Sequence, residues 1–513
     1  MVPPGPALPL WHALAPAPPP VEWLAVIAYE NDQITLSEAD MADFPATAQT
    51  GVAAKRPVMN PSFTPAGKDA ASMQVLRFAA PARVGLPSVM LDELDVWLDT
   101  ARIDFSSCRV KGANLARQQR PAPEAFSFAL ASCRYPAGLP DKNLAESALK
   151  QLAANSHELD FVIFCGDQIY ADATAGMMDP VRRDERYDLP YEAAFQAEPM
   201  RSIARAMPVY TLLDDHEIVD NWEPMVQPSR RATRKEEALR RHALNAFFKY
   251  QRMEGDTNVR DDALERRTSM QFERGCASFF LLDTRSQRQY RKPGNVNATG
   301  LFARGELSRL EAWLTEEKKE TAKTKKVKFI VSPSLLLPRR LGALNKGADH
   351  AARSDGWDGY PGDLRALLGF IALNEIENVV FLSGDEHLGC VASAELSIAK
   401  PCGRVARTRI VSIHASGLYS PFPFANSQAR DFIQGIDEFS IGAVQCTSKA
   451  VFVPPGSLFA SLHIECNAGT PSLGVEFHLP EQKLEFDNVL DAGPPDQAQT
   501  HPRVVETPIA TAL

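Results

Sequence analysis

The sequence predicts an α/β protein, and two features of the chain after Phe126 support this prediction. Apolar, strand-like runs alternate there with amphipathic runs of helical spacing. The strand-like runs are almost continuously apolar, as is typical of strands in sheets that helices cover. The chain has 513 residues, which is enough for roughly two to three structural units.

The expected elements follow one another in an order typical of α/β proteins. Strands are expected at residues 126–132, 161–165, 208–213, 278–283, 326–332, 378–384 and 407–418. Helices are expected at residues 141–156, 235–250, 307–320 and 361–375. Near the end of the chain, residues 460–467 and 474–479 alternate between apolar and polar side chains, which predicts a hairpin.

The beginning and the end of the chain differ from this α/β region. Short strand-like runs, separated by turns rich in proline, glycine and alanine, predict a mostly β accessory domain over residues 1–120. These runs are residues 23–30, 73–80 and 96–105. Prolines and charges at 117–125 predict a linker. We expect the main α/β domain at residues 121–480 and a polar, proline-containing C-terminal tail at 481–513.

Composition excludes several classes of protein. The net charge of −9 argues against a nucleic-acid-binding surface, and no apolar stretch approaches the ~20 residues that span a bilayer. The eight cysteines are scattered without a CxxC pair, so we expect reduced cysteines rather than a disulfide scaffold. Because the N-terminus has no recognisable export signal, the expected location is cytoplasmic.

Chemically active residues follow five of the expected strands. They occur in the runs SCR (132–134), GDQIY (166–170), DDHE (214–217), DTR (283–285) and SGDEH (383–387). The carboxyl ends of strands in an open α/β sheet face a common crevice where ligands bind. The sequence therefore predicts one site that gathers these runs.

Taken singly, each of these residues has a structural explanation. An aspartate after a strand is often a cap or turn residue, a buried cysteine is often a small hydrophobe, and Asp283 could pair with Arg285. The clusters DDHE and DEH, however, are costly unless cations neutralise them, because close carboxylates raise one another's pKa. They predict a metal site. Carboxylates suit hard divalent ions, whereas a phenolate and a thiolate favour trivalent iron, and Asp167 could bridge two ions.

The ordered set of runs resembles the alkaline phosphatase D family of the calcineurin-like metallophosphoesterase superfamily. The resemblance covers about residues 125–425 and includes SDGWDGYPGDLRALL (354–368) and HASGLYSP (414–421). It implies a four-layer α/β/β/α metallophosphoesterase sandwich with metals at the strand ends. The N-terminal region is more weakly similar to the β-sandwich domain that precedes such catalytic domains.

The resemblance also implies a set of metal ligands. Matched residue by residue, they are Cys133, Asp167, Tyr170, Asp215, Asp385 and His387. Asp167 would bridge the ions, while the thiolate, the phenolate and His387 would bind Fe³⁺. The two remaining aspartates would bind the divalent ion, which is Ca²⁺ in the family. Mn²⁺ or Zn²⁺ are the alternatives.

The implied reaction is phosphate ester hydrolysis by a metal-bound hydroxide. His216 would contact the substrate or protonate the leaving group, and Arg134 and Arg285 are candidates for a phosphate clamp. Glu386, where relatives usually carry an apolar residue, either adds to the metal site or points away. The expected partner is a small-molecule phosphate ester, and the oligomeric state stays open.

Three alternatives remain at this point. A phosphodiesterase or phospholipase D-type enzyme would use the same core with another pocket rim. A non-catalytic binding protein would keep only the fold. A thiol hydrolase would use Cys133 as the nucleophile with His216 or His387 as the base, and unlike the metalloenzyme it would survive chelation.

Overall fold

The structure is a computed structural model. Its described residues are 125–136, 142–172, 185–224, 230–251, 267–303, 305–321, 325–345, 347–400, 403–421, 427–467, 469–480, 482–491 and 502–506, together with three N-terminal strands. Those strands are β1 (Val21–Tyr29), β2 (Val58–Asn60) and β3 (Ser72–Ala80), which form an antiparallel sheet of order β1-β3-β2. The expected strands at 23–30 and 73–80 fall on β1 and β3, whereas 96–105 lies outside the described residues.

Two larger sheets form the body of the protein. The seven-stranded sheet has the order β18-β17-β16-β15-β4-β5-β6. Its strands are β4 (Ala125–Ala131), β5 (Phe161–Cys165), β6 (Val209–Leu212), β15 (Phe459–Asn467), β16 (Thr470–His478), β17 (Gln482–Phe486) and β18 (Arg503–Glu506). The predicted hairpin near the end of the chain is confirmed as β15 and β16. Strands β17 and β18 lie within the segment that was expected to be a tail.

The eight-stranded sheet has the order β13-β14-β11-β12-β10-β9-β8-β7. Its strands are β7 (Met270–Arg274), β8 (Ala277–Leu281), β9 (Val327–Val331), β10 (Val379–Ser383), β11 (Gly389–Ala399), β12 (Val405–Ala415), β13 (Ile436–Ile441) and β14 (Val444–Phe452). Strands β8, β9, β10 and β12 run parallel, as do β4, β5 and β6 in the other sheet. Their carboxyl ends therefore meet at one edge of the sandwich.

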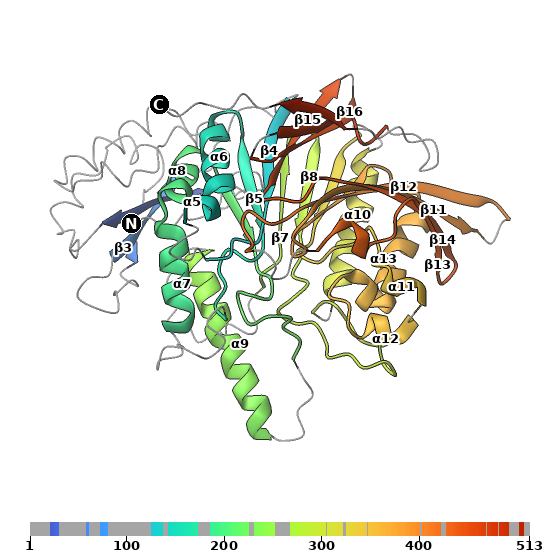
Figure 1. The fold of residues 1–513 in the computed structure, drawn as a ribbon, viewed down its shortest axis with the longest axis horizontal. Coiled ribbons are helices and arrows are strands. Elements are labelled where there is room, and N and C mark those ends of the chain that lie inside the picture. The colour runs from blue at the N-terminus through green and yellow to red at the C-terminus, as the bar shows by residue number, and fades with distance from the viewer. Residues whose placement is uncertain are drawn as a thin grey trace.

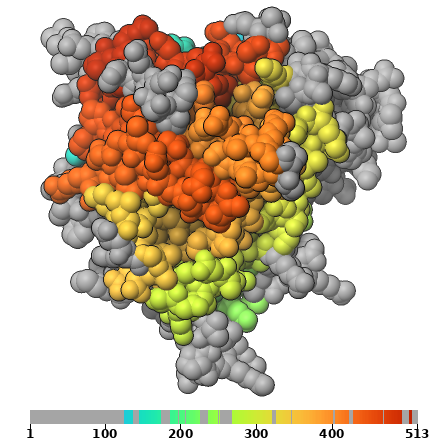
Figure 2. All heavy atoms as spheres, turned by 90° about the vertical axis from the view of Figure 1, so that its right-hand side faces the viewer, coloured from blue at the N-terminus to red at the C-terminus, as the bar shows by residue number. Residues whose placement is uncertain are grey.

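Helices cover the outer face of each sheet (Figure 1). Beside the seven-stranded sheet lie α5 (Lys142–Ala145), α6 (Ser147–Ala154), α7 (Glu185–Gln196), α8 (Glu198–Ala206) and α9 (Arg230–Tyr250). Beside the eight-stranded sheet lie α10 (Glu306–Thr321), α11 (Gly342–Asn345), α12 (Gly347–Ala351) and α13 (Pro361–Leu373). In the view of this second side, orange surface from the β11–β14 region lies beside yellow surface from the α10–α13 region (Figure 2).

The buried side chains of β5 show why this sheet needs a layer on each face. Phe161, Ile163 and Cys165 pack into the core between the two sheets. Val162 and Phe164 point the other way, into the core beneath α6, α8 and α9. A third core lies between the eight-stranded sheet and α10 and α13. The predicted four-layer α/β/β/α sandwich is thus confirmed.

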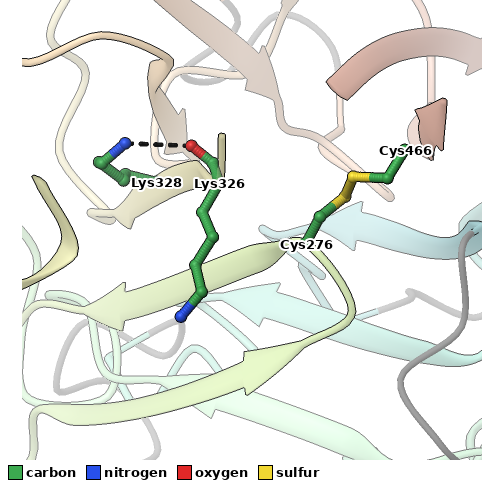
Figure 3. Close-up of a disulfide and its surroundings, with 4 residues drawn as sticks. All are labelled: Cys276, Lys326, Lys328 and Cys466. Carbon is green, nitrogen blue, oxygen red and sulfur yellow. Dashed lines mark hydrogen bonds between the residues drawn. A yellow bond between two sulfur atoms is a disulfide. The ribbon is translucent and has the colours of Figure 1, made fainter. Parts of the chain in front are cut away.

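A disulfide joins the two sheets (Figure 3). Cys276 lies in the turn before β8, and Cys466 lies near the end of β15, which runs antiparallel to β4. The link is therefore at the end of the sandwich opposite the carboxyl ends of the parallel strands. The prediction that the cysteines are reduced is wrong for this pair, because residues 190 positions apart meet across the two sheets. Cys133, Cys165, Cys390 and Cys446 are free and buried.

Candidate metal centre

Three of the predicted ligands lie in loops of unusual backbone conformation. Cys133, Asp167 and Asp385 follow β4, β5 and β10, and their φ angles are 56°, 57° and 76°. A residue with a side chain rarely adopts this left-handed conformation, and such strain concentrates at functional sites. The sharp turns after the strands aim the three side chains at one another across the gap between the sheets.

One side of the centre brings together a thiol, a phenol and an imidazole. Cys133 Sγ lies 3.2 Å from Asp167 Oδ2, and the hydroxyl of Tyr170 lies 3.2 Å from His387 Nε2. Ligand atoms of Cys133, Asp167 and His387 all lie within 4.8 Å of one another. Cys133, Tyr170 and His387 are the residues that the family resemblance assigned to iron, with Asp167 as the bridge.

The other side of the centre is a cluster of carboxylates. Asp167, Asp214, Asp215 and Asp385 each place an oxygen within 4.8 Å of the others. A third group joins Asp167 and Asp215 to His216, so Asp167 belongs to all three groups. Sequence reasoning had assigned no role to Asp214, although it is the first acid of DDHE.

Gly166 allows this cluster to form. Its φ angle is 92°, and a Cβ atom at this position would lie 2.4 Å from the Cβ atom of Asp214. The loop after β5 can therefore approach the end of β6 only if residue 166 has no side chain. This close approach brings Asp167 to Asp214 and Asp215.

Burial makes ionisation of the centre unfavourable in the absence of cations. It raises the pKa of the Asp167 and Asp385 carboxyls well above their usual range, and neighbouring acids raise both further. Burial also raises the pKa of the Cys133 thiol to about 11 and that of Asp214 to about 7, the latter despite the nearby guanidinium of Arg285. Bound cations would reverse these shifts.

Glu217, the last residue of DDHE, ties two of the loops together. Its carboxylate accepts hydrogen bonds from the backbone N–H groups of Asp167 (3.0 Å), Gln168 (2.8 Å) and Asp214 (2.9 Å). It is fully buried. Glu217 therefore fixes the loop after β5 against the loop after β6.

Arg285 is fully buried behind the carboxylates. Its Nε donates to Asp214 at 2.6 Å, and its Nη1 and Nη2 donate to the two oxygens of Asp355 at 2.8 and 2.5 Å. Its guanidinium does not pair with Asp283, which instead accepts hydrogen bonds from the Thr268 hydroxyl and from the backbone N–H groups of Arg285 and Ser286. A substrate phosphate would have to displace a carboxylate to reach this guanidinium. These contacts favour a positioning role over the predicted phosphate clamp.

Arg134, the other candidate for the clamp, donates from Nη1 to the carbonyl of Ala194 at 2.6 Å. Burial lowers its pKa to about 10. Glu386 turns away from the predicted metal ligands, because Arg340 holds both of its oxygens and Ser427 donates a further hydrogen bond. The extra carboxylate of SGDEH thus belongs to an ion pair at the side of the centre.

His216 lies over the ring of Tyr170, with ring centroids 4.0 Å apart. Its Nδ1 contacts Asp172 Oδ1 at 2.8 Å, and the backbone N–H of Asp220 fixes the other oxygen of Asp172. Burial lowers the pKa of His216, but Asp215 and Asp172 outweigh this effect and raise it to about 9. Sequence reasoning missed Asp172, although it follows GDQIY by only two residues.

A comparison with models of known protein families gives one match. Residues 128–433, more than half of the chain, match the family model of PhoD-like phosphatases. Fold and match together define a phosphoesterase. The chain belongs to the PhoD-like phosphatase family.

Two solved structures are similar to this chain at low sequence identity. The first is described as the structure of PhoD, with 16% identity, a TM-score of 0.48, and coverage of 75% of this chain and 72% of that chain. The second is GAP50, the anchor in the inner membrane complex of Plasmodium, with 11% identity, a TM-score of 0.34, and coverage of 74% and 88%. No curated protein sequence matches the chain. Among the described residues, no helix has the length and apolarity to cross a membrane.

Proposed function

We propose that this protein is a binuclear metal-dependent phosphoesterase that holds Fe³⁺ and a divalent ion, most simply Ca²⁺, on either side of Asp167. The observation that carries this proposal is that Asp167 belongs to all three potential metal-binding groups. Buried oxygens support it as well: Asp167 Oδ1, Asp214 Oδ2 and Asp215 Oδ1 have no hydrogen-bond partner among the described residues. A buried, unsatisfied carboxylate oxygen is costly unless a cation binds it.

The donor atoms divide according to their chemistry. Cys133, Tyr170 and His387 would hold the iron, and Asp215 and Asp385 would hold the divalent ion. When bound, the two ions would polarise the phosphoryl group and make a water molecule a better nucleophile. Mn²⁺ or Zn²⁺ in place of either ion would be compatible with the same ligands.

His216 would act as the proton donor to the leaving group. Its Nδ1 is held by Asp172, which directs Nε2 away from this contact. In the metal-free protein Asp215 and Asp172 raise the pKa of the imidazole, and the contact with Asp172, which is not a predicted metal ligand, would still favour the protonated ring that a general acid requires when ions are bound. Asp172 orients the His216 ring and favours its protonated form. Loss of Asp172 should therefore lower the rate of hydrolysis most for substrates with poor leaving groups.

A thiol hydrolase receives less support. Cys133 is fully buried, and burial raises the pKa of its thiol. The thiol contacts the Asp167 carboxylate and the Ser416 hydroxyl, and although the candidate base His387 lies within 4.8 Å, no neighbour lowers the pKa below its usual value. An activated thiol needs a lowered pKa and a nearby base.

The predicted cytoplasmic location stays a prediction, and the Cys276–Cys466 disulfide weighs against it because disulfides are rare in reducing compartments.

Elemental analysis of the gently purified protein tests the proposal. We expect iron and a divalent ion, each near one per chain, and hydrolysis of p-nitrophenyl phosphate that chelation abolishes and metal restores. Bis-p-nitrophenyl phosphate, assayed in parallel, would reveal a preference for diesters. Activity that survives chelation but not alkylation would overturn the metal mechanism in favour of the thiol mechanism.

A further inference from the structure

Strand β12 ends in His414 and Ala415, and Ser416 follows it; these three residues begin the HASGLYSP segment. None of the three belongs to a potential metal-binding group among the described residues. Two of their side chains nevertheless touch the ligand loops: Ser416 Oγ lies 3.0 Å from Cys133 Sγ, and His414 contacts the loop after β10. The residues at the end of β12 thus contact the predicted metal ligands and their loops but are not themselves predicted ligands.

The contacts of His414 fix its tautomer. The ring is fully buried, with Nε2 2.6 Å from the carbonyl oxygen of Glu386 and Nδ1 2.8 Å from Ser383 Oγ. A carbonyl oxygen can only accept, so Nε2 carries the proton and donates it to Glu386. Nδ1 is then the acceptor for the hydroxyl of Ser383. The ring makes both of its hydrogen bonds as a neutral imidazole.

These two partners bracket Asp385. Ser383 is the last residue of β10, and Glu386 separates Asp385 from His387. Asp385 has a strained φ angle of 76°, and strained residues keep their conformation only where their surroundings hold them. The hydrogen bond from Nε2–H of His414 to the Glu386 carbonyl holds this short loop after β10 in place.

We propose that His414 is a positioning residue that aims Asp385 and His387 at the metal centre. The effect on bound ions rests on the proposed function, whereas the effect on the loop does not. Partners that orient metal ligands without touching the metal commonly change metal affinity by about 10–100-fold.

The test compares His414→Gln and His414→Asn in the full-length chain. The amide nitrogen of glutamine takes the place of Nε2 and can still donate to Glu386, whereas that of asparagine takes the place of Nδ1 and cannot. His478→Asn is the matched control, because His478 is also buried and contacts a serine, Ser461, at 2.8 Å without touching a ligand loop. The readouts are Co²⁺ titration of the metal-stripped protein and hydrogen exchange of the backbone amides of residues 384–388.

We expect His414→Asn to weaken one of two Co²⁺ sites by about 10–100-fold and to speed amide exchange at residues 384–388. His414→Gln should recover most of both losses, and His478→Asn should resemble the wild type. Wild-type affinity and wild-type exchange in His414→Asn, or equal losses in all three variants, would overturn the inference. Elemental analysis of the purified wild type decides the proposed function separately, and if the wild type binds no Co²⁺, hydrogen exchange alone decides whether His414 holds the loop.

Discussion

The two ends of the sandwich are built in opposite ways. At the carboxyl ends of the parallel strands, Asp167, Asp214, Asp215 and Asp385 crowd together and leave buried oxygens without partners. At the other end, several polar groups satisfy one another. Ser278 donates to Glu317, and Lys326 pairs with Glu273 and Glu317. Lys328 donates to the carbonyl of Lys326 (Figure 3) and to that of Glu377.

The difference shows which end is built for stability and which for chemistry. The Cys276–Cys466 disulfide closes the satisfied end covalently. The unsatisfied end combines strained backbone with carboxyls whose pKa is raised by burial, a combination that destabilises the protein unless cations bind there. Changes at the two ends should therefore affect different measurements.

The largest expected effect comes from comparing two Asp→Asn variants, one after the end of β5 and one before its start. Asp167→Asn should abolish hydrolysis and weaken metal binding by at least about 100-fold, because the shared ligand loses its charge. Asp160→Asn changes the residue just before β5, where the carboxylate contacts Arg274 and the backbone N–H of Ser127, and should leave metal content unchanged. Elemental analysis and p-nitrophenyl phosphate assays compare them. An active, metal-loaded Asp167→Asn variant would remove the proposed centre.

The second effect concerns the disulfide. Cys276→Ser should lower the free energy of unfolding by about 3–5 kcal/mol, because the link restricts a loop of 190 residues in the unfolded chain. Metal content should not change. Urea unfolding under oxidising conditions measures the loss, with Cys446→Ser as the control at a free, buried cysteine. Equal stability of the two variants would show that the bond contributes nothing in solution.

The third effect is a pH dependence of the metal-free protein. Burial raises the pKa of Asp214 from 3.8 to about 7. Between about pH 4 and pH 7 the folded protein therefore keeps a proton on this carboxyl, whereas the unfolded chain has lost it. This contribution to stability is present below about pH 4 and is lost as the pH rises toward 7, by up to about 1.4 kcal/mol per pH unit. Urea unfolding at pH 5 and pH 7 measures the slope.

Asp214→Asn is the control for this slope, because an amide does not titrate. The metal-free variant should lose less stability than the wild type between pH 5 and pH 7. Metal binding should also release protons, which calorimetry in buffers of different ionisation enthalpy detects. Identical slopes in the two proteins would show that Asp214 is already ionised when no metal is present.

The smallest effect is expected for Tyr170→Phe. It removes the hydroxyl 3.2 Å from His387 but keeps the ring that stacks on His216. The visible absorbance of an iron–phenolate contact should disappear, while metal affinity falls by about 10-fold or less. Absorption spectra of the two proteins at equal iron content decide the point. An unchanged absorption band in the Tyr170→Phe variant would show that the Tyr170 phenol does not bind the iron.

The strand ends could be predicted because they depend on local pattern, whereas the four-layer order was implied by the family resemblance. Apolar runs ending in acids located β5, β6 and β10, and the carboxyl ends of parallel strands have to meet. The placement of Arg285 could not be predicted, since its partners Asp214 and Asp355 are about 70 residues away in each direction. The Cys276–Cys466 bond escaped prediction for the same reason: no local pattern encodes a contact between two sheets.

The seven-stranded sheet has a consequence for how the chain is made. Its interior strand β4 pairs with β5 on one side and with β15 on the other, where Leu130 faces Ala460. A ribosome must therefore synthesise more than 300 further residues before β4 can acquire its second neighbour. Until then the growing chain exposes an open strand edge beside the Cys133 loop, and contacts this distant in sequence form slowly. Vectorial synthesis thus completes the scaffold of the metal centre only when its last strands emerge.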